Sequence, residues 1–215
     1  MNLEPLELPL AFNEGAIFFF ALTGALAARR LGYDIVGVFA LAFVSGLGGG
    51  VCRDLLLGVG GPVPALTEPG FMLAVLLGTM GGLFRVSAKL ENFNRLVAFL
   101  DAIGLGAFAA VGTHKALKLE LSWLNAVFVG VVNAVGGGLL RDLLVRVEPL
   151  MMKPGQFYAL AALFGACTYA GLTLTLHIQP LPAAICATIA TVAFRILAIA
   201  FNWKTRAVDQ LAPNP

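Results

Sequence analysis

Long apolar runs separated by short polar connections dominate the chain. A helix needs about 20 mostly apolar residues to cross a bilayer, and the short connections leave no room for a separate soluble domain. The pattern predicts an all-α polytopic membrane protein with seven transmembrane helices. The predicted spans cover residues 10–28, 35–57, 69–87, 94–112, 122–145, 155–175 and 181–202.

Composition supports this interpretation. Apolar residues make up 59% of the chain and charged residues 12%, against roughly 25% charged residues in soluble domains. The net charge of +2 is too small to indicate a nucleic-acid partner, so the lipid bilayer is the expected partner. Glu4 and Glu7 without a basic residue nearby argue against a cleaved signal peptide. Three cysteines in apolar segments are expected to be small buried residues: Cys52, Cys167 and Cys186.

Lysine and arginine are unevenly distributed between the two sides of the predicted bundle. The side that carries the N-terminus has Lys115 and Lys118 only, whereas the opposite side has nine basic residues. Basic residues concentrate in cytoplasmic loops, so we expect a protein of the cell (inner) membrane with its N-terminus outside and its C-terminus in the cytoplasm. The nine are Arg29, Arg30, Arg85, Lys89, Arg95, Arg146, Lys153, Lys204 and Arg206.

One unusual phrase occurs twice. GGGVCRDLLLG at Gly48–Gly58 and GGGLLRDLLVR at Gly136–Arg146 are 88 residues apart, and the same offset relates Asn13 to Asp101. Each repeat holds three spans, and an odd number forces the second copy to insert upside down. The sequence predicts two inverted three-helix repeats plus a seventh helix. The expected division is 1–92 for the first repeat, 93–178 for the second, and 179–215 for the seventh helix and cytoplasmic tail.

The glycine triplets are expected to break their helices. Each glycine lowers helix propensity by about 1 kcal/mol relative to alanine, and freed backbone groups at membrane depth are tolerated only inside protein or beside a watery cavity. We therefore expect both triplets to kink their helices and line a path near the bilayer centre. Ser45 and Asn133, one turn earlier, are expected to wet that path. The triplets are Gly48, Gly49 and Gly50, and Gly136, Gly137 and Gly138.

An Arg-Asp pair follows each triplet inside its span. An intramembrane charge costs roughly 2.5–3.5 kcal/mol on insertion scales, so it pairs with another group or lines a wet path. Adjacent helical residues point about 100° apart, so Arg53 and Asp54 are not expected to neutralise each other. Two interpretations stay open: each arginine ties its kink to another span, or it lines the pore and gates it. The second pair is Arg141 and Asp142.

Asp101 lies alone in the otherwise apolar fourth span and is expected to be functional or ion-paired, with Arg195 or a repeat arginine as its partner. His114 and His177 fall in predicted loops and are expected at the surface. The chain has no phosphate-binding loop, zinc-protease motif or paired CxxC. We therefore expect no enzyme activity, no cofactor and no metal site, apart from a permeant K⁺ or Na⁺.

The two GGGxxRDLL phrases, in a chain with seven predicted spans, resemble the prokaryotic members of the trimeric intracellular cation (TRIC) channel family, also labelled the glycine transporter or UPF0126 family. The resemblance covers about Asn13 to Trp203. It implies a homotrimer in which each protomer carries its own pore, with glycine-kinked second and fifth spans, passing monovalent cations and chiefly potassium.

The family label leaves other functions open. A secondary carrier for a small amino acid such as glycine, working by alternating access, is the main alternative to a channel. A membrane scaffold or enzyme without transport activity is a third possibility. The Lys-Glu-Val phrase of the animal channels is not present at the glycine-rich phrase here, so the resemblance does not extend to their lipid regulation.

Overall fold

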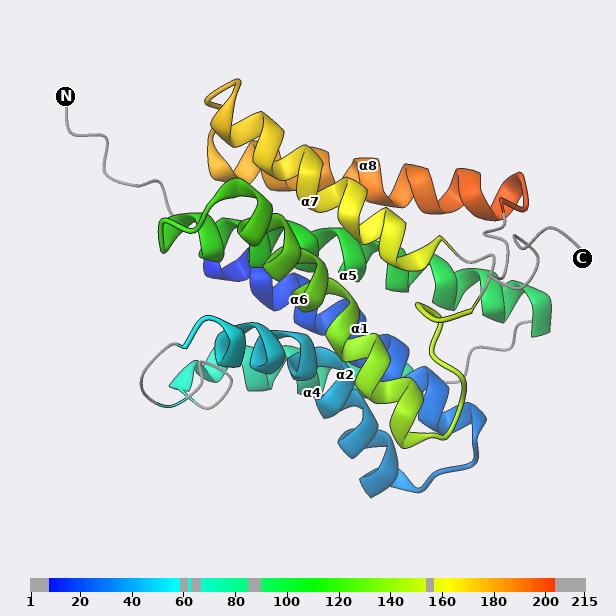
Figure 1. Cartoon of the computed structure of the whole chain (residues 1–215). Helices are drawn as coiled ribbons and strands as arrows, with labels where there is room; N and C mark the ends of the chain where they lie inside the picture. Colours follow the sequence, from blue (N-terminus) through cyan, green and yellow to red (C-terminus); the bar gives the residue numbers. More distant parts are fainter. Residues whose placement is uncertain (1–7, 59–61, 63–66, 85–89, 154–156, 204–215) are drawn as a thin grey trace, which may run out of the picture.

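The computed structural model describes residues 8–58, 62, 67–84, 90–153 and 157–203. Within them the chain is helical and contains no strand. The helices are α1 (Leu10–Arg30), α2 (Ile35–Leu56), α4 (Pro69–Leu83), α5 (Leu90–Lys118), α6 (Trp123–Leu144), α7 (Tyr158–Leu174) and α8 (Pro180–Ala200) (Figure 1).

The helices match the predicted spans, with differences at their ends. Five of them are long and apolar enough to cross a membrane, namely α1, α2, α6, α8 and α5 over Phe93–Lys118. The apolar helices α4 and α7 are shorter, with 15 and 17 residues. Helix α5 extends beyond both ends of its predicted span. Its C-terminal extension carries Lys115, whose long side chain is only partly buried and can reach a polar environment from within the helix.

The second helix of each repeat begins at a residue whose side chain caps the helix N-terminus. The side chain of Asp34 accepts a hydrogen bond from Gly37 N (2.8 Å) at the start of α2, and Ser122 accepts one from Asn125 N (3.4 Å) at the start of α6. Short polar side chains at this position satisfy backbone donors that the first helical turn leaves free. The two caps are related by the same offset of 88 residues as the triplets.

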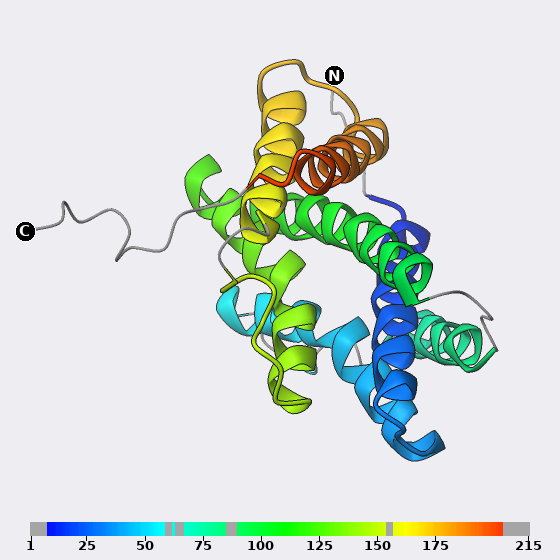
Figure 2. The same cartoon turned by 90° about the vertical axis from the view of Figure 1, so that its right-hand side faces the viewer.

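The two repeats pack face to face. Helix α1 packs on α2 and α4, α5 packs on α6 and α7, and the repeats meet along α1–α5 and α2–α6. Helix α8 has no counterpart and packs on α5 and α7. Figures 1 and 2 show α7 and α8 together on one side of the bundle and α2 and α4 on the other.

The repeats are inverted, as the sequence predicted. The end of α1 lies beside the start of α5, where Arg30 Nη1 donates to Asn94 Oδ1 (2.6 Å). At the other end of the bundle, Leu10 and Lys118 line a common cavity. The helices α1 and α5 are therefore antiparallel. The residue limits of the repeats stay a prediction, and four residues of the charge count lie outside the described part: Arg85, Lys89, Lys204 and Arg206.

The helices are not interrupted at the triplets, since both α2 and α6 continue as helix through their three glycines. Figure 1 shows α2 changing direction along its length, and the kink at each triplet stays a prediction. The expectation for the cysteines is wrong in part: Cys52 is half-buried, but Cys167 and Cys186 are exposed. The outer surface of a membrane bundle is itself apolar, so an apolar segment does not imply a buried position.

Candidate functional site

The glycine triplets form the crossing point of α2 and α6. A Cβ atom added at Gly49 would overlap the carbonyl oxygen of Asn133, and one added at Gly137 would overlap the carbonyl oxygen of Ser45. A Cβ atom at Gly136 would lie 3.1 Å from Gly49 Cα. The contact is reciprocal under the 88-residue offset. The triplets therefore allow two backbones to touch, which is the role of small residues between membrane helices.

Ser45 and Asn133 are fully buried beside this crossing. Ser45 Oγ donates to Leu41 O (2.7 Å), and Asn133 Nδ2 donates to Phe108 O (2.6 Å). Neither residue lines the cavities described below. Their proposed contact with a wet path therefore stays a prediction.

A cavity enters the bundle at the start of α1 and the end of α5. We call it the Arg53 cavity; its volume is about 250 Å³, and a smaller space of about 10 Å³ extends it inward. Asn13, Arg53 and Phe71 line both parts, and Phe108 lies at the inner end. The remaining residues of the larger part are Leu8, Pro9, Leu10, Glu68, Val111, His114, Lys115 and Lys118.

A second cavity, of about 630 Å³, enters from the opposite end of α1 and α5. We call it the Arg141 cavity. Among the described residues, it shares no lining residue with the first cavity or its extension. Its charged lining residues are Arg30, Asp101, Arg141, Asp142, Glu148, Lys153 and Arg195.

The Arg53 cluster consists of Arg53, Asp54 and Lys115. Arg53 Nε lies 2.8 Å from Asp54 Oδ1, and Arg53 Nη2 lies 3.1 Å from Asp54 Oδ2. Lys115 Nζ, from α5, lies 2.6 Å from Asp54 Oδ1. The Arg53 and Asp54 side chains are only 4% and 3% exposed, whereas Lys115 is 29% exposed. This cluster holds two cations and one carboxylate.

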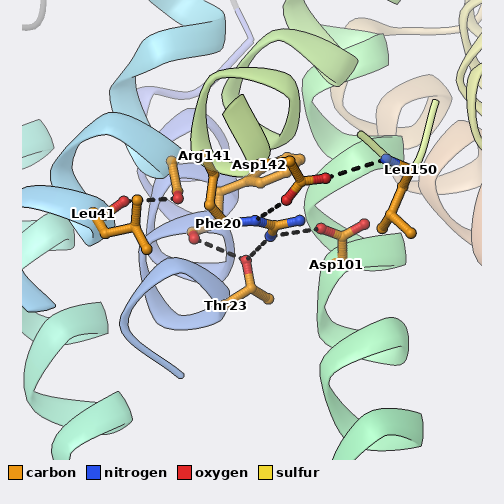
Figure 3. Close-up of polar contacts among 8 residues, drawn as sticks. Phe20, Thr23, Leu41, Asp101, Arg141, Asp142 and Leu150 are labelled. Atoms are coloured by element: carbon orange, nitrogen blue, oxygen red, sulfur yellow. Dashed lines mark hydrogen bonds and ion pairs between the residues drawn. The ribbon is translucent and has the colours of Figure 1, made fainter. Parts of the chain in front are cut away.

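The Arg141 cluster consists of Arg141, Asp142 and Asp101 (Figure 3). Arg141 Nε lies 2.9 Å from Asp142 Oδ1, and Nη1 lies 3.3 Å from both Asp101 Oδ1 and Thr23 Oγ1. Asp142 Oδ2 also accepts a hydrogen bond from Leu150 N (3.2 Å). This cluster holds one cation and two carboxylates. Arg141 therefore connects α6 to both α5 and α1.

These contacts correct one prediction and confirm another. Arg53 and Asp54 do pair with each other, as do Arg141 and Asp142. The angular argument was wrong because a long arginine side chain can fold back along its helix to reach its neighbour. The pairing of Asp101 with a repeat arginine is confirmed by Arg141. Arg141 bridges helices, as the first interpretation expected, and also lines a cavity. The role of the arginines in lining and gating a pore stays a prediction.

Sequence reasoning missed Lys115 as a site residue and placed His114 in a surface loop. Both lie within α5. His114 Nδ1 is 2.7 Å from Tyr169 Oη, and its Nε2 accepts a hydrogen bond from Leu8 N (3.4 Å). The duplication could have predicted this, because the residue 88 positions before Lys115 is Ala27, which lies in the last turn of α1.

The antiparallel repeats, their crossing at glycines and the two opposed charged cavities define a polytopic membrane protein of the inverted-repeat class, an architecture typical of transport proteins. A family model described as "Glycine transporter" matches residues 10–85 and again residues 98–174. The chain belongs to this family, the TRIC/UPF0126 family of membrane proteins. The double match also confirms the internal duplication.

Three relatives illustrate the similarity. UPF0126 inner membrane protein YadS of Escherichia coli K12 is 32% identical over 89% of this chain and 92% of its own length. UPF0126 membrane protein YvgT of Bacillus subtilis is 36% identical over 87% and 90%. The TRIC trimeric intracellular cation channel orthologue from Rhodobacter sphaeroides has a TM-score of 0.80 and 32% identity, over 89% of this chain and 97% of that chain.

Proposed function

We propose that the protein is a monovalent cation channel, chiefly for potassium, with one conduction path in each protomer of a homotrimer. The observation that carries this proposal is the pair of cavities that enter from opposite ends of α1 and α5. The Rhodobacter sphaeroides relative, described as a trimeric intracellular cation channel orthologue, supports both the channel and the trimer. The path runs from the Arg53 cavity, past the glycine crossing, to the Arg141 cavity.

The arginines along this path do not exclude a cation, because neighbouring carboxylates balance their charge. An isolated arginine would repel a potassium ion, because two unit charges interact strongly in a low-dielectric interior. Here each repeat arginine is paired with the carboxylate that follows it. The Arg141 cluster has a second carboxylate, Asp101, so the charge of Arg141 is balanced by two carboxylates, while Arg195 lines the same cavity.

The path also has a proposed direction in the membrane. Arg30 and Lys153 line the Arg141 cavity, and basic residues favour the cytoplasmic side. We infer that the Arg141 cavity faces the cytoplasm and the Arg53 cavity faces outward, with the N-terminus outside and the C-terminus inside. The pore-lining role of the triplets and of Ser45 and Asn133 belongs to the same proposal.

A secondary carrier for a small amino acid such as glycine is the second candidate. The separation of the two cavities favours it, because alternating access needs a site that opens to one side at a time. The Arg141 cavity also presents both cations and carboxylates, as a zwitterion requires. The description of the matching family model agrees with this candidate.

Single-channel recording separates the two candidates. The purified protein is inserted into a planar bilayer under a potassium gluconate gradient, and insertion is verified by quantifying protein in the same membranes. Discrete current steps that reverse near the potassium equilibrium potential establish the channel. No current, together with saturable uptake of labelled glycine into vesicles, replaces the channel by the carrier.

A further inference from the structure

The α1 residues that line the two cavities form one stripe at helical spacing. Ile17 is the last of them on the Arg53 side, and Ala27 is the first on the Arg141 side. The same spacing of three and four residues places Phe20 and Gly24 between them. The stripe is completed by Leu10, Asn13 and Arg30, and Leu31 follows directly after the helix.

Helix α5 carries a matching stripe. Phe108 is its last residue on the Arg53 side, and Asp101 is its first on the Arg141 side. Two positions lie between them at this spacing, Gly104, which has no side chain, and the buried Leu105. The stripe continues through Val111, Lys115 and Lys118 in one direction and through Val97 and Asn94 in the other. Between the cavities, the two stripes therefore present Leu105 and two bulky aromatic side chains, Phe20 and Phe108.

These two side chains lie against each other. Their ring centroids are 5.1 Å apart with an interplanar angle of 15°, and the residues are 0% and 1% exposed. A Cβ atom at Gly104 would lie only 2.8 Å from Phe20 Cδ2, so the glycine makes room for the Phe20 ring on α5. Phe20 and Phe108 are themselves related by the 88-residue offset. The stacked pair therefore lies between the repeats, where their inverted copies meet.

We propose that the stacked Phe20–Phe108 pair is the gate that separates the Arg53 cavity from the Arg141 cavity. This inference rests on the proposed channel function. Hydrophobic constrictions close pores because water, and with it a hydrated ion, is expelled from a narrow apolar segment. Opening requires only that the rings separate as α1 and α5 move, and no charge has to leave its partner. Arg141 lies on the cavity side of the pair and keeps its contacts with Asp101 and Asp142.

The test is a size series at one ring. Potassium flux is measured in vesicles that contain equal amounts of inserted wild-type protein, Phe108→Trp, Phe108→Leu or Phe108→Ala, and the series is repeated for Phe20→Ala. Potassium flux is expected to rise as the side chain becomes smaller, by roughly tenfold from Phe to Ala. A rise of this size corresponds to a modest decrease in the free-energy barrier to permeation. Phe108→Trp is expected to conduct less than wild type.

The chain offers a matched control. Phe164 and Phe194 are a second stacked pair, with ring centroids 5.2 Å apart, at the contact between α7 and α8, and neither lines the two cavities. Phe164→Ala is expected to leave potassium flux within about twofold of wild type. Reversal potentials report whether each variant still selects potassium over a large organic cation, which distinguishes an open gate from a damaged bundle.

Each result has a defined meaning. Graded flux with selectivity retained supports the gate. If wild-type protein conducts potassium and all variants of the series conduct equally, the gate proposal is wrong but the channel proposal stands. A rise in flux with loss of selectivity, or an equal rise in Phe164→Ala, also overturns the gate. No conduction from any protein, Phe108→Leu and Phe108→Ala included, contradicts the channel itself.

Discussion

The Arg53 and Arg141 clusters begin from the same sequence phrase and end with opposite charge balance. Beside its own arginine, Asp54 receives a second cation, Lys115, whereas Asp142 receives, among the described residues, the backbone N–H of Leu150. The position of Asp101 in the second repeat is occupied by Asn13 in the first. Two positions outside the duplicated phrase therefore convert a cluster with an excess cation into one with an excess carboxylate.

The rest of the two repeats has stayed alike. The helix caps at Asp34 and Ser122 match, and so do the backbone contacts of Gly49 and Gly137. The comparison separates the molecule into a symmetric scaffold of backbone contacts and an asymmetric set of charges. Because the bilayer has two different sides, the asymmetric charges can favour an ion at one end of the proposed path while the scaffold keeps its two-fold symmetry.

The largest effect is expected from removing the Arg141 guanidinium. Arg141→Met leaves Asp101 and Asp142 buried without their cation, and breaking a buried pair in this way costs about 3–5 kcal/mol. Arg53→Met is expected to cost less, because Lys115 remains 2.6 Å from Asp54. Thermal unfolding of the two variants in the same detergent measures the difference. Equal losses of stability would show that the clusters are energetically alike.

The next largest effect is expected at the glycine crossing, where the repeats are equivalent. Gly49→Ala and Gly137→Ala each drive a methyl group into a carbonyl oxygen of the facing helix, and overpacking typically costs about 1–3 kcal/mol. The two variants should lose the same stability within experimental error. Gly15→Ala is the control, since nothing lies within 4 Å of its added Cβ. A large difference between the two crossing variants would refute the symmetry of the scaffold.

The symmetric scaffold was largely readable from the sequence. Apolar runs located the helices, and the doubled phrase located the crossing, because backbone patterns repeat with the chain. The charge contacts were harder to predict. Whether Arg53 turns toward Asp54 depends on side-chain torsions that helical geometry leaves free, and the Lys115–Asp54 pair depends on how far α5 extends beyond its apolar run. The close backbone contact at the triplets was not predicted, because helix propensity gives no account of the carbonyl oxygens that face Gly49 and Gly137.

A smaller effect is expected from exchanging the residues that distinguish the clusters. Asp101→Asn leaves Arg141 paired with Asp142 alone and removes one charged hydrogen bond, at a cost of about 1.5 kcal/mol. The same variant should weaken the preference for cations over anions, measured from reversal potentials in a potassium chloride gradient. Asn13→Asp, which adds a carboxylate beside Arg53, should strengthen it. If the reversal potentials of Asp101→Asn and Asn13→Asp shifted in the same direction, these two charges would not determine the cation preference.

The smallest effect is expected from Lys115. Its side chain is 29% exposed, and Asp54 keeps both contacts with Arg53 when Lys115 is replaced. Lys115→Met should therefore cost no more than about 1 kcal/mol, the range of partly exposed ion pairs. Thermal unfolding measures this loss, with Lys118→Met, at the exposed end of α5, as the control. A loss as large as that of Arg141→Met would mean that Arg53 alone does not hold Asp54.

The glycine crossing has a consequence for the origin of the chain. Gly49 meets Asn133 as Gly137 meets Ser45, which is the isologous relation found in two-fold dimers. A three-helix unit able to insert in both orientations would offer this contact to its own inverted copy, before any fusion of the two. Joining the copies in one chain then required no new surface at the crossing and left the side chains around it free to diverge.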